Sequence, residues 1–160
     1  MTYRIEEIKS EYNDGIEAVI RSCLVEFGAD HEGTAWTDPM LGRFSELYDE
    51  EASDYWVAVD ESGKVVGGVG VGPLPGAAGV CELQKMYCLS TARGTGVAGQ
   101  LLNRALEYAA DHYDQVYLET FESMLAAQKF YRKHGFKQIP DRMGDTGHYA
   151  CDVFFLKDLK

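Results

Sequence analysis

The sequence predicts one α/β (α+β) domain over residues 1–160, with a mixed, mostly antiparallel central sheet flanked by about four helices. Two apolar runs, at 55–60 and 64–73, are joined by a short polar turn, as in an antiparallel hairpin. Further along, runs at 81–90 and 116–120 enclose a helical pattern, as in a βαβ unit with parallel strands. No repeat, linker or low-complexity segment divides the chain.

The start of the chain predicts a strand followed by a helix. Residues 3–8 alternate weakly between polar and apolar side chains, which favours a strand. Residues 15–27 place their apolar side chains on one helical stripe, and Asn13 or Asp14 is suited to cap the first turn.

A second, shorter helix is predicted at 39–49, after an irregular polar stretch at 28–38. Asp38 is suited to be its N-cap. Pro39 is suited to be its first residue, because that position needs no N–H donor.

The rest of the chain predicts two longer helices and the closing strands. The first helix follows a glycine-rich bend and ends near His112. The second covers 123–134 and is ended by Gly135 as its C′ residue. The remaining elements are a strand at 136–139, a polar loop at 141–147 and a last strand at 148–156.

The formal net charge is −11, from 15 Lys and Arg against 26 Asp and Glu. An acidic surface repels nucleic acid and anionic membrane, so neither is expected as a partner. It suits a cationic substrate such as an amine, although acidity also serves solubility alone. No apolar run is long enough to span a bilayer and no leader is recognisable, so we expect a soluble, cytoplasmic protein.

The four cysteines show neither CxxC spacing nor the spacing of metal ligands, and we expect reduced, buried thiols. They are Cys23, Cys81, Cys88 and Cys151. Cys81 and Cys88 lie an odd number of positions apart on one predicted strand, which places them on opposite faces of the sheet. The Asp-His-Glu run at 30–32 lacks a second cluster and predicts a polar loop, so no metal site is expected.

The glycine-rich bend between the strand at 81–90 and the next helix predicts an anion site. The first turn of a helix leaves N–H groups unpaired, and glycines let a bulky anion approach the backbone. A phosphate or pyrophosphate is the expected guest, and a tight turn without a ligand is the competing interpretation. The predicted binding residues are Arg93, Gly94, Thr95, Gly96, Val97, Ala98 and Gly99.

The same glycines satisfy the dinucleotide fingerprint G-x-G-x-x-G, and Glu119 follows at about the distance of the residue that binds a ribose hydroxyl. An NAD(P)-binding oxidoreductase is therefore an alternative. Its position in the chain argues against it, because the fingerprint normally opens the sheet. Too little chain remains after Glu119 for a doubly wound sheet.

The bend also matches the pattern R-x-x-G-x-A, starting at Arg93. With this motif the sequence resembles the GNAT superfamily of acetyl-CoA-dependent N-acetyltransferases. The resemblance continues at the strand end with Glu119 and in the pattern A-x-x-x-Y-x-x-x-G-F, which starts at Ala127, and it covers about residues 80–137. It implies a GNAT-like fold, with acetyl-CoA as cosubstrate, and it is compatible with a homodimer.

The resemblance also implies further contacts to coenzyme A. Main-chain groups of Met86, Tyr87 and Cys88 would contact the pantetheine arm and the thioester oxygen, and a bulge or splay in this strand would free them. An Asn often found near the start of the last helix is Met124 here, and the neighbouring Ser123 is the candidate substitute.

Tyr131 and Glu82 are the expected catalytic residues. The resemblance assigns to Tyr131 the donation of a proton to the leaving thiolate, and simple ring packing is the alternative. Histone-acetylating members of the superfamily carry a catalytic Glu at the same offset before the bend. This makes Glu82 the candidate base, with an ordinary surface or strand-edge glutamate as the alternative. Glu119 and His148 are rival bases.

The expected function is transfer of an acetyl group from acetyl-CoA directly to a primary amine of a small molecule or peptide. The alternatives are the NAD(P)-binding oxidoreductase and a non-catalytic acyl-CoA-binding regulatory module, against which Tyr131 weighs. The choice of acceptor is expected to lie in the regions 28–49, 73–80 and 140–148, where the resemblance gives no guide.

Overall fold

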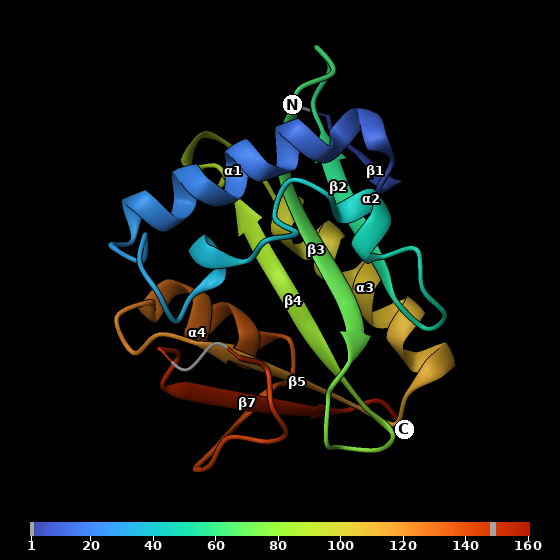
Figure 1. Cartoon of the computed structure of the whole chain (residues 1–160), viewed down its shortest axis with the longest axis vertical. Helices are drawn as coiled ribbons and strands as arrows, with labels where there is room; N and C mark the ends of the chain where they lie inside the picture. The colour runs from blue at the N-terminus through green and yellow to red at the C-terminus, as the bar shows by residue number, and fades with distance from the viewer. Residues whose placement is uncertain (1, 148–149) are drawn as a thin grey trace.

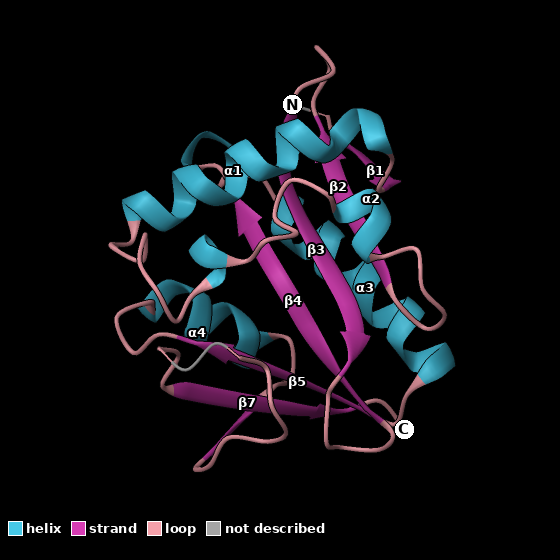
Figure 2. Ribbon diagram, in the orientation of Figure 1, coloured by secondary structure: helices cyan, strands magenta, loops and turns pink. Residues whose placement is uncertain are grey.

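The computed structural model describes residues 2–147 and 150–160. One sheet runs through the molecule, with helices on both sides (Figure 1, Figure 2). The strands are β1 (Arg4–Glu7), β2 (Asp54–Val59), β3 (Val65–Pro73), β4 (Val80–Cys88), β5 (Gln115–Thr120), β6 (Lys137–Ile139) and β7 (Val153–Asp158). The helices are α1 (Asn13–Glu26), α2 (Phe44–Leu47), α3 (Val97–His112) and α4 (Leu125–Lys133).

The seven strands are arranged in the order β1-β2-β3-β4-β5-β7-β6. All neighbours are antiparallel except β4 and β5, which are parallel because α3 connects them as a crossover. The prediction of a mixed, mostly antiparallel sheet with four helices is confirmed.

The helices lie on both faces of the sheet (Figure 2), and they bury one hydrophobic cluster on each face. Side chains of α1 and α2 form one cluster with β2, and Ile16, Ile20 and Phe44 in it are fully buried. Side chains of α3 and α4 pack on the other face, where Leu101 and Leu102 are equally buried. Each such side chain contributes about 1.5–3 kcal/mol through burial, which fixes the helices against the sheet.

β4 and β5 are paired only near their first residues. Residues 80–82 of β4 lie opposite 115–117 of β5, and the register ends there. The two strands meet near the C-terminus of the chain and diverge from that point (Figure 1). The edge of β4 that lies beyond residue 82 therefore has no partner strand on this side, and its backbone groups are open to a ligand.

A β-bulge interrupts β4 in the same region. Lys85 adopts a left-handed backbone conformation with φ of 47°, and the register with β3 shifts between Gly68 and Gly70. This conformation costs a non-glycine residue about 1–2 kcal/mol. The Tyr55 hydroxyl donates a hydrogen bond of 2.7 Å to the Lys85 carbonyl oxygen, which helps to offset that cost.

The bulge changes which side chains share a face of β4. Cys81 and Cys88 both pack against the cluster beneath α3. The prediction that they lie on opposite faces is therefore wrong, because one extra residue in a strand shifts the alternation of side chains by one.

The second helix, α2, is shorter than predicted and does not begin at Pro39. The Asp38 carboxylate accepts from the backbone N–H of Met40 at 2.9 Å and forms an ion pair with Lys85, also at 2.9 Å. These contacts fold the chain into turns ahead of α2. The predicted role of Asp38 as N-cap is therefore wrong.

The helix α1 begins at Asn13, directly after a 3-10 turn, so neither Asn13 nor Asp14 caps it. The Asn13 side chain bonds to α2 instead. Its Nδ2 donates to the Ser45 hydroxyl at 2.8 Å, and its Oδ1 accepts from the Ser45 N–H at 3.0 Å. Asn13 was predicted as a possible cap of α1, but its side chain links α1 to α2 instead.

The last strand, β7, begins at Val153 rather than at residue 148. His148 lies outside the described residues. The other predicted strands and helices, apart from the second helix, lie within about two residues of the observed bounds, which is the usual uncertainty of element ends. In the part of the chain that the structure describes, no helix combines the length and apolar character needed to cross a membrane.

Candidate active site

Two cavities adjoin each other where β4 and β5 diverge. The larger has a volume of about 440 Å³ and the smaller about 70 Å³. Four residues line both: Met86, Tyr87, Met124 and Tyr131. The bulged half of β4 and the helix α4 therefore separate a large cavity from a small one.

Most of the predicted cofactor-binding residues line the larger cavity. They are Met86, Tyr87, Cys88, Arg93, Gly94, Gly96, Ala98 and Ser123. The other three do not line it. Val97 is a core residue with 1% of its surface exposed, the Thr95 hydroxyl donates to the Ala92 carbonyl oxygen, and Gly99 lies in the first turn of α3.

The start of α3 is suited to bind an anion. Gly96 precedes the helix with φ of 88°, no side chain caps the first turn, and no acidic residue lies in it. A Cβ atom built at Gly94, Gly96 or Gly99 would meet nothing within 4 Å. The unpaired N–H groups and the open space in front of them fit the diphosphate of coenzyme A.

Arg93 lies at the cavity but is already paired. Its guanidinium contacts both carboxylate oxygens of Glu26, at 2.5 and 2.9 Å, and its Nε donates to the Cys88 carbonyl oxygen at 3.1 Å. It also lies over the Phe27 ring, 5.1 Å from the centroid. The formal charge of Arg93 is therefore offset by Glu26.

Sequence reasoning missed the apolar wall of the larger cavity. The additional lining residues are Phe27, Ala92, Met124, Leu125, Ala126, Ala127 and Phe130. Leu125 is 71% exposed and Phe27 is 37% exposed, which is unusual for large apolar side chains. The apolar start of the helix predicted at 123–134 was the available signal. No pattern in the sequence pointed to Phe27, because it follows α1 and reaches the cavity only through the tertiary fold.

Glu82 lines the smaller cavity and is 5% exposed. Burial raises the pKa of its carboxyl group to about 7. A hydrogen bond of 2.8 Å from the Gln84 amide and the nearby Lys85 ammonium oppose this rise, and the Glu119 carboxylate adds to it. The predicted base is therefore a buried carboxyl group that titrates near neutrality, rather than a strand-edge glutamate.

Glu119 lines the same cavity but is held by three partners. Its carboxylate receives the Tyr117 hydroxyl at 2.6 Å, the Thr146 hydroxyl at 2.5 Å and the Arg142 Nε at 3.2 Å. Its side chain is 1% exposed. These contacts anchor the loop at 140–147 to β5 and leave Glu119 less available as a base than Glu82. The third candidate, His148, is outside the described residues.

Tyr131 lines both cavities and is 9% exposed. Its ring packs against Phe130 and Phe136, with centroids 5.6 and 5.7 Å away. Burial raises the pKa of the phenol, so the hydroxyl stays protonated and able to donate. Packing and donation are compatible, because the ring is held by its neighbours at the border between the cavities.

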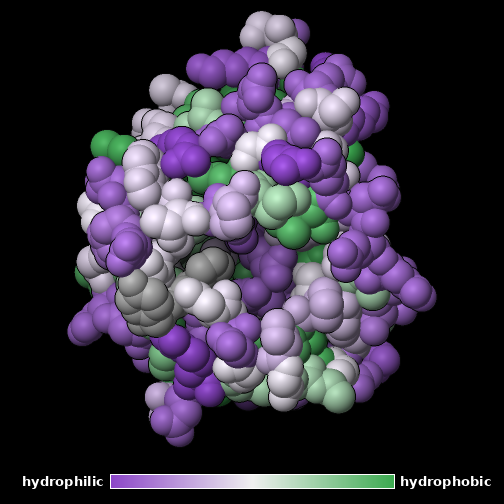
Figure 3. Space-filling view, viewed as in Figure 1, coloured by the Kyte–Doolittle hydropathy of each residue, from purple (hydrophilic) through white to green (hydrophobic). Residues whose placement is uncertain are grey.

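Distant parts of the chain complete the smaller cavity. Thr34 and Ala35 contribute from the loop at 28–38, and Cys151 from the segment before β7. Trp36 lies elsewhere, with its ring beneath the Arg21 guanidinium at 4.8 Å. Hydrophilic side chains gather in a hollow over the middle of β4 (Figure 3). No described residue of the predicted regions 73–80 and 140–148 lines either cavity, so 28–49 is the one predicted region whose described residues border them.

A model of the acetyltransferase (GNAT) family matches residues 17–136. The uncharacterized N-acetyltransferase YjgM of Escherichia coli is 39% identical over 150 residues, which are 92% of this chain and 89% of that protein. Neither match favours a dinucleotide-dependent oxidoreductase.

Two solved structures share the fold. A GNAT-family acetyltransferase of Staphylococcus aureus has a TM-score of 0.85 at 22% identity, covering 99% of this chain and 100% of that one. An aminoglycoside 6'-N-acetyltransferase complexed with coenzyme A has a TM-score of 0.71 at 18% identity, covering 98% of this chain and 97% of that one.

Proposed function

Because the chain belongs to the acetyltransferase (GNAT) family and is an acetyl-CoA-dependent N-acetyltransferase, we propose that it acetylates a primary amine of a small molecule or peptide directly. One observation carries this proposal. Glu82 and Tyr131 line the same small cavity, which adjoins the larger cavity at the start of α3. A proton acceptor and a proton donor would thus border the space between the proposed cosubstrate and acceptor sites.

The larger cavity is the proposed binding site of acetyl-CoA, which supplies the acetyl group as a thioester. The N–H groups at the start of α3, with Gly94 and Gly96, would hold the diphosphate. Main-chain groups of residues 86–88 would contact the pantetheine arm, in the part of β4 that is not paired with β5. Ser123, which lines the same cavity, would take the place of the missing Asn.

The smaller cavity is the proposed acceptor site, and Glu82 is its base. An alkylamine has a pKa of about 10.4, so it arrives as an ammonium ion and must lose a proton before it can react. The acidic groups Glu82 and Glu119 favour its entry. With a pKa of about 7, Glu82 is a stronger base than an ordinary carboxylate and is still substantially ionised at neutral pH. It would take the proton directly or through water.

Tyr131 would donate to the sulfur that leaves. Its phenol is protonated at working pH, and Tyr131 lines both cavities, so it would border the position where the thiolate develops. The ammonium ion loses two protons on its way to the amide. One would pass to Glu82 and then to solvent, and the other would replace the proton that Tyr131 gives to sulfur, so that the products are the acetylated amine, the free thiol of coenzyme A and one proton.

The proposal includes a cytoplasmic location. All four cysteines, of which three are buried, are unpaired, as is usual in a reducing compartment. A homodimer stays a prediction.

The direct test is an amine panel with acetyl-CoA, in which the release of free thiol is followed. The panel contains alkylamines, polyamines, amino acids, aminoglycosides and lysine peptides, and the control enzyme is Glu82→Gln. We expect at least one amine whose rate in the parent exceeds that in the variant by about 10²-fold or more. We also expect acetyl-CoA, but not NAD(P), to raise the melting temperature. Thiol release equal in parent and variant with every amine would contradict the proposal.

A further inference from the structure

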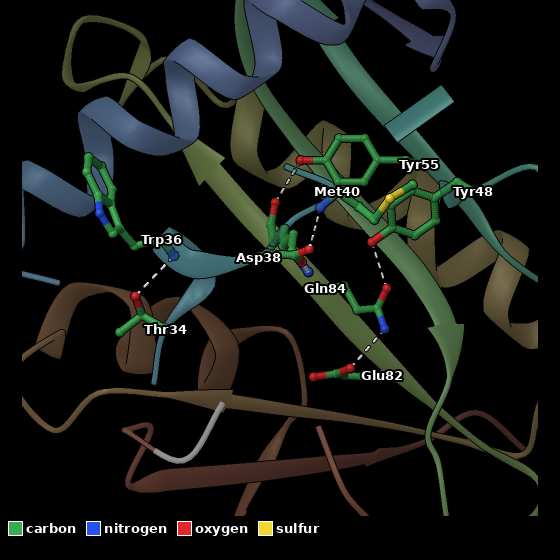
Figure 4. Close-up of polar contacts among 9 residues, drawn as sticks. Thr34, Trp36, Asp38, Met40, Tyr48, Tyr55, Glu82 and Gln84 are labelled. Atoms are coloured by element: carbon green, nitrogen blue, oxygen red, sulfur yellow. Dashed lines mark hydrogen bonds and ion pairs between the residues drawn. The ribbon is translucent and has the colours of Figure 1, made fainter. Parts of the chain in front are cut away.

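Glu82 is the end of a short chain of hydrogen bonds across the sheet. Gln84 lies two residues after Glu82 on β4, so the two side chains lie on the same face of the strand. The Gln84 Nε2 donates to Glu82 Oε1 at 2.8 Å. The Tyr48 hydroxyl donates to Gln84 Oε1 at 2.6 Å. Figure 4 shows the three side chains in one line, with Tyr48 reaching the strand from beyond α2.

The direction of these hydrogen bonds decides which end of the Gln84 carboxamide faces Glu82. A carboxamide has one donor end and one acceptor end, and its orientation follows from its neighbours. Tyr48 is 6% exposed, and burial raises the pKa of its phenol, so it keeps its proton and donates. Its donation to Oε1 turns the Nε2 of Gln84 toward Glu82. The opposite orientation would bring an amide oxygen against a carboxylate.

Glycines in β3 provide the space for this chain. A Cβ atom at Gly70 would lie 2.8 Å from the Tyr48 hydroxyl oxygen, and one at Gly72 would lie 3.1 Å from Gln84 Oε1. Both distances are too short for an ordinary contact with a carbon atom. Gly70 and Gly72 thus keep the surface of the sheet free for Tyr48 and Gln84.

We propose that Tyr48 and Gln84 are positioning residues, which orient the Glu82 carboxylate and keep it available as a base. This proposal rests on the proposed role of Glu82. The donated hydrogen bond favours the ionised form, so it limits the effect of burial and keeps Glu82 partly ionised at neutral pH. Tyr48 acts only through Gln84.

Other charged or titratable groups near Glu82 act differently. Lys85 favours its ionised form but is itself paired with Asp38 at 2.9 Å. Glu119 and Cys151 approach from β5 and from the segment before β7, and Glu119 disfavours the ionised form. Gln84 is the first of the groups that lower the pKa of Glu82, so its removal should have the largest effect on that titration.

The test is the titration of Glu82 in Gln84→Met, which has a similar shape but cannot donate. The pKa of Glu82 is read from the carboxyl carbon by NMR on protein with labelled glutamate, assigned by its loss in Glu82→Gln. Loss of a hydrogen bond to a charged group should raise this pKa by about one unit. The acidic limb of kcat/KM should move up by a similar amount. An unchanged carboxyl titration would overturn the proposal.

Tyr48→Phe tests the first link of the chain. We expect a smaller rise than in Gln84→Met, and no additional rise in the double variant, because Tyr48 acts only through Gln84. Tyr113→Phe is the matched control. It removes a hydroxyl that donates to the Ala52 carbonyl oxygen at 2.7 Å, away from the cavities, and it should leave the titration unchanged. Additive shifts from Tyr48 and Gln84 would contradict a single chain.

The two proposals fail in distinguishable ways. If Glu82→Gln leaves kcat/KM and its pH dependence unchanged, Glu82 is not the base. The NMR titration still reports whether Tyr48 and Gln84 control the carboxyl group. If Glu82→Gln removes the acidic limb but Gln84→Met does not shift the titration, only the positioning role is wrong.

Discussion

Two buried glutamates of the smaller cavity differ in the partners they have. Glu119 receives two hydroxyl groups and a guanidinium, which satisfy a carboxylate and hold a loop. Glu82 receives one amide hydrogen bond and is otherwise desolvated. These different partners suit the two carboxyl groups to different roles, Glu119 to holding a loop and Glu82 to exchanging a proton. The family resemblance made Glu82 the candidate base and Glu119 a rival. The sequence could not reveal how differently the two are surrounded, because Arg142 and Thr146 reach Glu119 from a loop further along the chain.

At Tyr131 we predict that substitution by Phe lowers kcat by about 10- to 100-fold, because a proton donor to the leaving group is lost. The affinity for acetyl-CoA should change little, since the ring and its contacts with Phe130 and Phe136 remain. Steady-state kinetics and calorimetry measure the two quantities. Unchanged turnover would remove the donor role and leave Tyr131 as a packing residue.

At Glu26 we predict that substitution by Gln tightens acetyl-CoA binding by about 3- to 10-fold at low salt. The change removes a negative charge near the expected diphosphate and frees Arg93 to pair with phosphate. The gain should shrink as salt rises, because the charges are partly exposed. Calorimetry at two salt concentrations measures it, with Glu61→Gln on the β2–β3 turn as control. Weaker binding would show that Glu26 is needed to position Arg93.

The two elements that form most of the site, β4 and α3, differ in how far the sequence alone predicts them. The strand, bend and helix around Arg93 could be predicted from sequence, because the glycines, the apolar stripe and the helix start are local signals. The bulge was expected, but its place at Lys85 was not. It depends on Tyr55 and Asp38, which lie far away in the chain. The start of α2 was mispredicted for the same reason.

For α3 we predict that Gly96→Glu abolishes detectable binding of acetyl-CoA. The side chain would add a negative charge at the start of the helix, in the space left for the diphosphate. Gly63→Glu is the matched control, because Gly63 also has φ of 88° and open space around it but lies on the β2–β3 turn. Calorimetry measures the affinity of both variants for acetyl-CoA. A loss in Gly96→Glu alone would reflect the anion site, whereas a loss in both would reflect the backbone strain that they share. Equal affinities would contradict an anion site at Gly96.

At the scale of the molecule, the site lies where two parts of the sheet separate. The part from β4 to α4 contains the motif residues, and these could be predicted. The acceptor walls could not, because Thr34, Ala35 and Cys151 meet only through tertiary contacts. One of these contacts is the hydrogen bond of 3.1 Å from the Ala150 N–H to the Gly33 carbonyl oxygen. No local sequence pattern predicts that these two distant loops contact each other.

The burial of Glu82 should be visible in the stability of the whole protein. Its pKa of about 7 in the fold exceeds the ordinary value of about 4.3, so the folded state binds the proton more tightly than the unfolded state. This contribution is present at low pH and is lost as pH rises from about 4.3 to 7. It amounts to roughly 4 kcal/mol at most.

We therefore predict that Glu82→Gln raises the melting temperature at pH 8 by about 5 °C, and that its advantage shrinks toward pH 5. Calorimetric melting curves across this range measure the difference. The parent must serve as reference at each pH, because other carboxyl groups also titrate. A variant less stable than the parent at pH 8 would show that the buried carboxylate carries no such cost.

The central claim, that Glu82 is the base of this acetyltransferase, is tested most directly by the pH dependence of kcat/KM in the parent and in Glu82→Gln. We predict an acidic limb in the parent with an apparent pKa near the value of about 7 that burial gives Glu82, and we predict that the variant lacks this limb. The same limb in both enzymes would contradict the claim.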